Sequence, residues 1–309
     1  MSRRGGSRIR SMISSNDIEY QESAVENGLR PTAAIYLRFW SLLALIPMLL
    51  MAQACQEDPA RDSGIAGPGT CQALERLSHV SILFGHQSVG GNIIEGMGEL
   101  ADACGTSTTN VIELSPEGGV NGPGFFSFYV GENGDPVGKI RDFESRSFKR
   151  VNVGLMKLCY VDFEPGTDVS AVFREYKDTI ERLQAKYPET YFVHVTVPVL
   201  ARERGIKAWA KNVLGRALWG DVENLQRQRY NEMLRAEYGS QDMLFDLALL
   251  EATDPRGRVL EHSLHGERFL AMYPAYTTDG GHLNEAGRRR VARAFVEFLA
   301  DVAAMKPAR

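Results

Sequence analysis

The stretch SILFGHQSVGGN, residues 81–92, has the pattern of a strand, a tight turn and the start of a helix. Residues 81–84 form a short apolar run, and apolar residues then recur at positions 93, 94, 97 and 100, which is helical spacing. Ser88 is therefore expected at the carboxyl end of a strand, where open α/β sheets bind ligands, and beside helix amides that can hold an anion. Its hydroxyl has two alternative roles, as a reacting group or as a helix cap.

Four further segments have strand patterns, at residues 110–114, 151–162, 191–198 and 243–247. Amphipathic helical patterns alternate with them, most clearly over residues 169–186. This alternation favours a parallel sheet covered on both faces. We predict a single three-layer α/β/α domain with a five-stranded parallel sheet, flavodoxin-like in topology. Between the second and third strands, residues 115–135 are expected to form a long glycine-rich loop, which in a compact domain is usually functional.

A second informative stretch is TDGGHLNEAG, residues 278–287, which directly precedes a helical pattern. Asp279 and His282 stand three residues apart, and the glycines between them allow a sharp turn that brings both side chains together. A carboxylate beside an imidazole fixes the tautomer of the ring and stabilises its protonated form, as an acyl-transfer base requires. The alternative is a helix-capping turn with an incidental histidine.

Together, the two stretches resemble the SGNH (GDSL-type) hydrolase superfamily, in which the serine follows the first strand and an Asp-x-x-His pair precedes the last helix. Ser88 matches the serine, and Asp279 and His282 match the pair. The resemblance covers about residues 78–303, with clear motifs at the two ends only. The family's Gly-Asp-Ser is replaced here by Gly-His-Gln-Ser, and its Gly-x-Asn-Asp by Cys-Tyr-Val-Asp at residues 159–162.

The resemblance also implies an oxyanion hole, with a glycine after the second strand. The candidates in this chain are Gly118, Gly119, Asn121 and Asn133, each of which has an ordinary turn as its alternative. Asn121, Asn133 or Tyr160 is a potential replacement for the missing asparagine, since amide and hydroxyl groups can both donate to an oxyanion. His86 is a further accessory candidate, as an oxyanion donor or as a packing residue.

The N-terminal part reads as an export signal. Residues 39–54 are apolar, follow arginines and end in an Ala-x-Ala pattern, which predicts a cleaved signal peptide within residues 1–54; an uncleaved membrane anchor is the alternative. Cys55 stands where a bacterial lipoprotein carries its lipid. Residues 55–70 are expected to be a linker, and residues 71–309 the hydrolase domain. We therefore expect an exported, periplasmic or cell-envelope protein whose membrane contact is through a lipid on Cys55.

The composition of the chain limits the kinds of ligand and partner that it is expected to bind. The 309-residue chain has a net charge of −4, which gives no footprint for nucleic acid. Export permits disulfides, and Cys71 and Cys104 are expected either to form one or to remain free thiols. No cofactor and no metal is expected, since His262 and His265 lack an obvious third ligand. Residues 201–220 are basic and carry two tryptophans, which indicates a lid, a substrate rim or a plain surface helix.

These observations predict an exported serine esterase acting through Ser88, His282 and Asp279. Its expected substrate is an O-acyl ester, with acetyl the first choice, on an extracellular glycan or lipid. The alternative is a surface-anchored binding protein on a catalytically inactive hydrolase scaffold, which the altered Gly-His-Gln-Ser block favours.

Overall fold

The computed structural model describes residues 66–106 and 111–305. The predicted signal peptide and Cys55 lie outside these residues, and the described residues belong to one compact unit. Helix α3 (Pro68–Leu77) already begins inside the stretch expected to be a linker. Its start is explained by Pro68 at the first helical position, where a missing amide hydrogen has no consequence.

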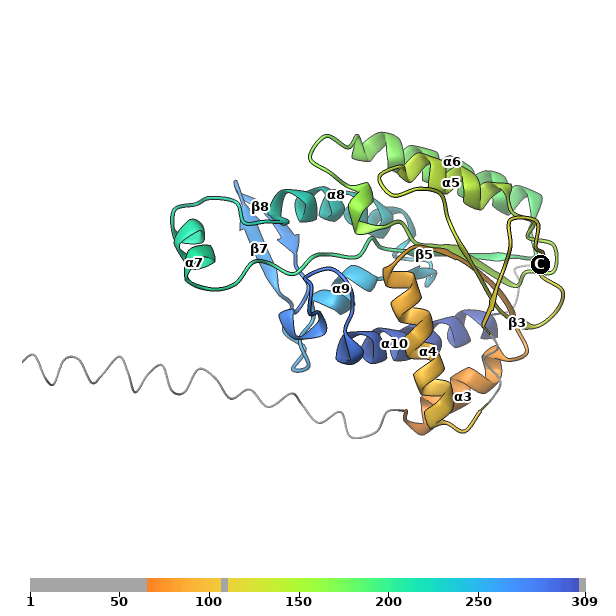
Figure 1. Ribbon diagram of the computed structural model, residues 1–309. Helices are drawn as coiled ribbons and strands as arrows, with labels where there is room; N and C mark the ends of the chain where they lie inside the picture. Colours follow the sequence, from red (N-terminus) through yellow and green to blue (C-terminus); the bar gives the residue numbers. More distant parts are fainter. Residues whose placement is uncertain (1–65, 107–110, 306–309) are drawn as a thin grey trace, which may run out of the picture. The chain divides into compact units, whose positions relative to one another are not determined.

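A six-stranded parallel sheet forms the centre of the domain (Figure 1). The strand order is β2-β3-β1-β4-β5-β6, and every neighbouring pair is parallel. The strands are β1 (Ser81–His86), β2 (Val111–Glu113), β3 (Gly124–Tyr129), β4 (Val153–Met156), β5 (Tyr191–Val195) and β6 (Leu244–Phe245). The predicted three-layer parallel architecture is confirmed, and the predicted strand number is corrected from five to six.

The additional strand is β3, which lies within the segment predicted to be a long loop. It is inserted between β1 and β2, so the second strand of the chain is displaced to the edge of the sheet. The run Gly-Phe-Phe-Ser-Phe-Tyr is rich in aromatic residues, which favour strands. The glycines on both sides concealed this short strand because they are typical of turns.

Helices cover both faces of the sheet (Figure 1). One apolar core joins the sheet to α3, α4 (Val89–Ala103) and α10 (Glu285–Ala304). The other core joins it to α5 (Pro136–Ser145), α6 (Val169–Lys186) and α8 (Asp221–Tyr238). Successive residues of β1 supply opposite cores: Ile82 and Phe84 belong to the first, and Leu83 to the second. This alternation follows from the two-residue period of a strand.

Helices α4 and α10 pack closely at Gly96. A Cβ atom placed on Gly96 would lie 2.7 Å from both the Cβ of Ala292 and the carbonyl oxygen of Arg288, so a larger residue would separate the helices. At the same contact, the guanidinium of Arg288 donates to the carboxylate of Glu99. This packing fixes the helix that follows Ser88 against the helix that follows His282.

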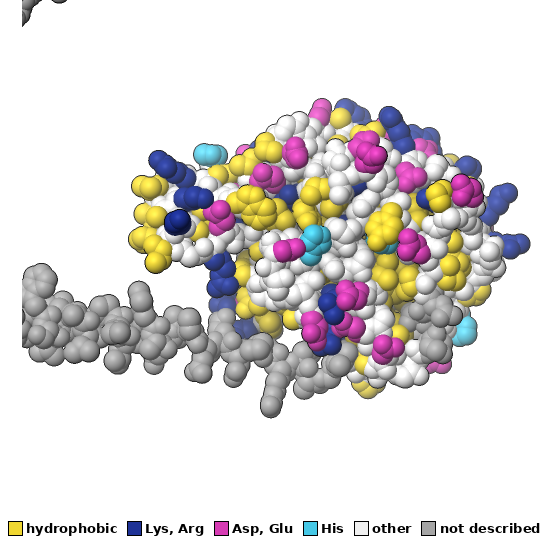
Figure 2. Space-filling view, in the orientation of Figure 1, with side chains coloured by type: hydrophobic (Ala, Val, Ile, Leu, Met, Phe, Trp, Pro, Cys, Tyr) yellow, Lys and Arg dark blue, Asp and Glu magenta, His cyan; other side chains and the backbone are white. Residues whose placement is uncertain are grey.

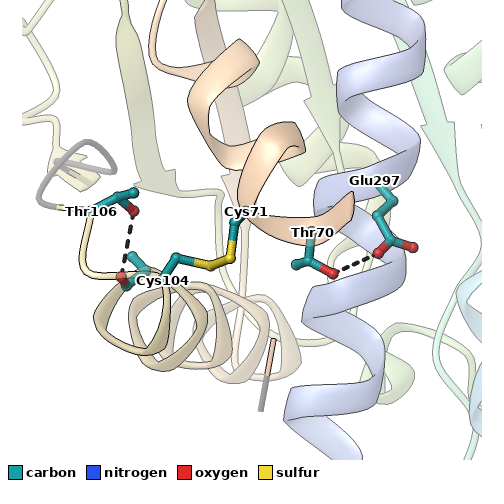
Figure 3. Close-up of a disulfide and its surroundings, with 6 residues drawn as sticks. Thr70, Cys71, Cys104, Thr106 and Glu297 are labelled. Carbon is teal, nitrogen blue, oxygen red and sulfur yellow. Dashed lines mark hydrogen bonds between the residues drawn. A yellow bond between two sulfur atoms is a disulfide. The ribbon is translucent and has the colours of Figure 1, made fainter. Parts of the chain in front are cut away.

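The predicted disulfide between Cys71 and Cys104 is confirmed (Figure 3). It joins α3 to the end of α4, with 5.5 Å between the two Cα atoms. Beside it, Thr70 donates a hydrogen bond to Glu297 on α10, at 2.7 Å. The start of the domain is thereby attached to both helices of this layer.

Four smaller elements and a hairpin complete the described chain. They are α7 (Ile206–Val213), α9 (Leu247–Ala252), two 3₁₀ turns (Tyr160–Asp162 and Pro274–Tyr276), and the antiparallel pair β7 (Glu261–Leu264) and β8 (Glu267–Leu270). No helix among the described residues is both long and apolar enough to cross a membrane.

Candidate functional site

Asp279 and His282 form a closed hydrogen-bonded turn before α10. Oδ2 of Asp279 lies 2.6 Å from Nδ1 of His282, while Oδ1 accepts the backbone N–H groups of Gly281 and His282, at 2.9 and 2.8 Å. Desolvation opposes ionisation of Asp279, but these hydrogen bonds hold its pKa well below the ordinary value. The left-handed backbone of Gly280 (φ 91°) makes the turn possible.

This turn is attached to the helix that follows Ser88. The side-chain oxygen of Asn92, in the first turns of α4, accepts the backbone N–H of Leu283 at 3.1 Å. The backbone N–H of Asn92 in turn donates to the carbonyl of Ser88, at 3.3 Å. Asn92 thus connects the residue after His282 to the start of α4. This role was not predicted, because its only signal in the sequence is a polar residue in a helical pattern.

Ser88 lies between β1 and α4 in a strained backbone conformation, with φ 23° and ψ −85°. Non-glycine residues with positive φ are uncommon, and such strain is concentrated at functional sites. The Ser88 side chain makes no capping hydrogen bond to α4. Its Oγ instead lies 3.5 Å from Sγ of Cys159. Ser88 therefore occupies the N-cap position of α4 without capping the helix through its hydroxyl.

The segment after β4 lies beside both partners. Cys159 faces Ser88, and the hydroxyl of the next residue, Tyr160, lies 3.4 Å from Nε2 of His282. Arg227 donates to the Tyr160 carbonyl at 2.9 Å, which holds this segment in place. Within the described part of the chain, no hydrogen bond joins Ser88 directly to His282. Catalytic hydrogen bonds are often long in ligand-free enzymes, so the lack of this hydrogen bond does not by itself exclude Ser88 and His282 as partners.

His86 is a buried packing residue at the end of β1. Its ring lies between those of Phe84 and Tyr129, with centroids 5.1 and 5.0 Å away, and its Nδ1 has no hydrogen-bond partner among the described residues. Burial, with a smaller effect from the charge of Lys157, lowers the pKa of His86 to about 4. A Cβ on Gly90 would lie 2.4 Å from the Cβ of His86, so this glycine makes room for the ring.

The oxyanion candidates from the glycine-rich segment are not brought together. Gly118, Gly119 and Asn121 lie on the connection from β2 to β3, which ends at the amino-terminal edge of the sheet. There, the carbonyl of Gly122 accepts from the hydroxyl of Ser81 at the start of β1. Asn121 is consequently placed near the opposite edge from Ser88.

Asn133 follows β3 and lies on the carboxyl side of the sheet, but its side chain faces a buried ion pair. The ammonium of Lys139 lies 2.7 Å from Asp162, and it also donates to Oδ1 of Asn133 at 3.3 Å. The other carboxylate oxygen of Asp162 accepts the backbone N–H of Cys159 at 2.7 Å. The Lys139–Asp162 ion pair therefore helps to hold the Cys159–Tyr160 segment in position.

A second buried group of charges lies beside the site. The ammonium of Lys157 donates to the Leu158 carbonyl at 3.1 Å, and burial lowers its pKa. Glu251 on α9 accepts from the backbone N–H of Val199 at 2.8 Å, and burial raises its pKa to about 8. Residues 66–106 and 111–305 contain no group of three or more His, Cys, Asp or Glu side chains that could hold a metal ion.

Comparison with known proteins gives distant likenesses in structure only. No protein-family profile and no curated protein sequence matches this chain. A candidate platelet activating factor from Streptococcus pneumonia aligns with 87% of this chain and 100% of its own, at 14% identity and a TM-score of 0.43. A candidate lipolytic protein of the G-D-S-L family from Desulfitobacterium hafniense aligns with 72% of this chain and 99% of its own, at 6% identity and a TM-score of 0.39.

The C-terminal domain of the Drosophila Oskar protein gives a third likeness. It aligns with 73% of this chain and 95% of its own, at 14% identity and a TM-score of 0.37. At these identities and scores, the assignment of a function depends on the site itself.

Proposed function

We propose that this protein is a serine hydrolase that cleaves an ester through Ser88, His282 and Asp279. Ser88 is the nucleophile, His282 is the general base, and Asp279 orients and stabilises the His282 ring. The observation that carries the proposal is the state of Ser88: its backbone is strained and its hydroxyl does not cap the helix. Ser88 lies one helical turn before Asn92, whose side chain accepts the backbone N–H of Leu283, the residue after His282.

The chemistry follows from the tautomer that Asp279 imposes. Because Nδ1 of His282 donates to Asp279, the lone pair of the neutral ring is on Nε2. This nitrogen accepts the proton of Ser88 as Oγ bonds to the ester carbonyl carbon. It then returns the proton to the departing alcohol, and an acyl-enzyme remains. Water, deprotonated by the same nitrogen, releases the acid and regenerates Ser88.

The negative oxygen of the tetrahedral intermediate requires donors. The backbone N–H of Ser88 has no hydrogen-bond partner within the described residues and lies at the start of α4, where the helix dipole favours negative charge. The hydroxyl of Tyr160 is a second candidate donor, because it stands beside Nε2 of His282. The reaction requires no cofactor.

The substrate class is inferred from the expected export of the chain. An apolar segment at residues 39–54 followed by Cys55 supports delivery to the periplasm or cell envelope, with a lipid anchor at that cysteine. Esters exposed there include O-acyl groups on glycans and lipids, of which acetyl is the smallest. We therefore propose an O-acyl ester on an extracellular glycan or lipid as the substrate.

A fluorophosphonate probe tests the nucleophile directly. The wild-type protein should gain one probe mass on the peptide containing Ser88 and should hydrolyse p-nitrophenyl acetate. Ser88→Ala should lose both properties, whereas Ser78→Ala, at the C-terminal end of α3 before β1 begins, should keep both. Labelling of Ser88→Ala at the wild-type rate would contradict the assignment.

The alternative is a binding protein on an inactive scaffold, favoured by the altered Gly-His-Gln-Ser block and by the lack of a direct Ser88–His282 hydrogen bond. It would be supported if the folded wild type ignored the probe and hydrolysed none of a panel of acetyl, butyryl and longer acyl esters.

A further inference from the structure

Helix α7 carries apolar side chains that face away from the protein. Ala208 is the only buried residue of this helix. The exposed fractions are 86% for Ile206, 66% for Trp209, 64% for Val213 and 68% for Leu214. Figure 2 shows hydrophobic and basic side chains together on the lobe that projects at the left, where Figure 1 places α7.

The orientation of α7 is the reverse of that of an ordinary surface helix. Ile206, Trp209 and Val213 occupy one face at intervals of three and four residues, whereas Ala208 is on the opposite face. Surface helices normally turn the apolar face to the core. An apolar face that is exposed in this way marks a binding surface for an apolar partner.

The charges around this face identify the partner. Residues 201–220 contain five Lys or Arg side chains and one Glu, whereas the whole chain has a net charge of −4. Lys211 is paired with Glu203 at 2.9 Å. Within the described part of the chain, Arg204, Lys207 and Arg216 make no ion pair, and all three are exposed. Basic residues beside exposed Trp and Ile are the pattern of a helix that lies in an anionic lipid surface.

Both ends of the α7 segment rest on the turn that holds His282. The backbone N–H of Ala201 donates to the Gly280 carbonyl at 2.9 Å, and a Cβ on Gly280 would lie 3.4 Å from the ring of Trp219. The side chain of Arg202 also pairs with that of Asp221 at 2.7 Å, which joins the start of the α7 segment to the residue that begins α8. Helix α7 therefore projects from the rim of the candidate site.

We propose that α7 docks this protein on the surface of an anionic phospholipid bilayer. The side chains of Ile206, Trp209 and Val213 enter the boundary between head groups and acyl chains, and Arg204, Lys207 and Arg216 contact the lipid phosphates. Tryptophan is enriched at this boundary because its ring is amphipathic. This docking surface is separate from the predicted lipid on Cys55, and it does not depend on catalysis by Ser88.

Hydrogen exchange on the full chain gives a local readout that an N-terminal anchor does not produce. The amides of residues 206–214 should exchange more slowly with vesicles of equal parts phosphatidylglycerol and phosphatidylcholine. Phosphatidylcholine vesicles should protect them less, and high salt should remove the difference. Absence of protection in α7 while the chain sediments with anionic vesicles would overturn the proposal. Concentration-dependent protection without vesicles would overturn it in favour of contact between two copies.

Matched variants measure separately what the apolar and the basic side chains of the α7 segment contribute to vesicle binding. Ile206→Ser combined with Trp209→Ser should lower the partition coefficient on anionic vesicles by about tenfold or more, whereas Ile112→Ser, an exposed isoleucine on β2, should not. Lys207→Glu combined with Arg216→Glu should lower it by at least about tenfold. Its control is Lys149→Glu combined with Arg174→Glu. Equal effects of test and control pairs would contradict docking through α7.

Ser88→Ala separates docking from the proposed chemistry. This variant should partition on vesicles like the wild type, even though it is expected to lose ester hydrolysis. If Ser88→Ala and wild type both dock but neither hydrolyses esters, the esterase proposal fails and the docking proposal stands. Loss of vesicle binding in folded Ser88→Ala would contradict a docking surface confined to α7.

Discussion

Two histidines of this domain have polar partners of similar geometry but very different surroundings. His282 is partly exposed, with its Nδ1 at 2.6 Å from the Asp279 carboxylate. His194 on β5 is buried, with its Nδ1 at 2.9 Å from the Tyr176 hydroxyl and its ring stacked on Tyr238 at 3.5 Å. Burial alone lowers the pKa of His194 to about 3, so this ring is neutral at physiological pH.

Under the proposed function, this difference explains why His282 rather than His194 serves as the base. A carboxylate partner stabilises the imidazolium that forms during proton transfer, and solvent access leaves Nε2 of His282 available to a substrate. A hydroxyl partner in an apolar layer offers no such charge, and desolvation opposes protonation.

The largest expected effect separates the two histidines by activity. His282→Ala should lower kcat/KM for a small activated ester by about 10³-fold or more, because the three residues act as a unit. His194→Ala should retain wild-type turnover per folded molecule, measured by active-site titration with the fluorophosphonate probe. Comparable losses of activity in both folded variants would contradict the assignment of His282 as the base and His194 as a packing residue.

Asp279→Asn should have the next largest effect, about 10²-fold on kcat, smaller than that of His282→Ala. The imidazole remains in this variant, but the charge that fixes its tautomer is gone. The amide oxygen can still accept the backbone N–H groups of Gly281 and His282, so thermal unfolding should report a folded protein. If kcat is unchanged, Asp279 does not orient the ring.

Substitution of the two histidines should have the opposite order of effect on stability from the order of effect on activity. His194→Ala should lower the free energy of unfolding by about 2–3 kcal/mol, because it removes a stacked ring and leaves a buried Tyr176 hydroxyl without its partner. His282→Ala, at a partly exposed position, should change it by less than about 1 kcal/mol. Urea unfolding followed by circular dichroism gives both values.

The dependence of stability on acid pH should also distinguish the two histidines. The depressed pKa of His194 means that the unfolded chain binds a proton below pH 6.5 that the native chain does not bind until about pH 3. Its contribution to stability is therefore complete above pH 6.5 and is lost as the pH falls, at about 1.4 kcal/mol per pH unit. His194→Phe keeps the stack and should make the acid slope shallower by this amount. His86, with a pKa lowered to about 4, should maintain part of the slope in that variant.

The smallest expected effect concerns Tyr160. Tyr160→Phe removes the hydroxyl that lies beside Nε2 of His282, and we expect kcat to fall by less than about tenfold because one oxyanion donor, the Ser88 amide, remains. A loss as large as that in Ser88→Ala would assign Tyr160 a direct part in the proton transfer, and would weaken the assignment of His282 as sole base.

The pattern of apolar residues was sufficient for the layers of the fold but not for the order of the strands. Helix α6 occupies the predicted residues 169–186, because its apolar face repeats at the helical period over a long segment. Strand β3 was hidden, since six residues between glycines carry too little periodicity to distinguish a strand from a loop. Its position beside β1 depends on pairing between segments distant in sequence.

The sequence by itself determined what is local in this protein. Asp279 and His282 meet because two glycines between them allow one tight turn. Only the tertiary structure decided what faces Ser88. Cys159 and Tyr160 arrive from another strand, and the α7 segment turns its apolar face outward. Such contacts join residues tens of positions apart, so they are fixed by the packing of the whole domain and leave no periodic signal in the sequence.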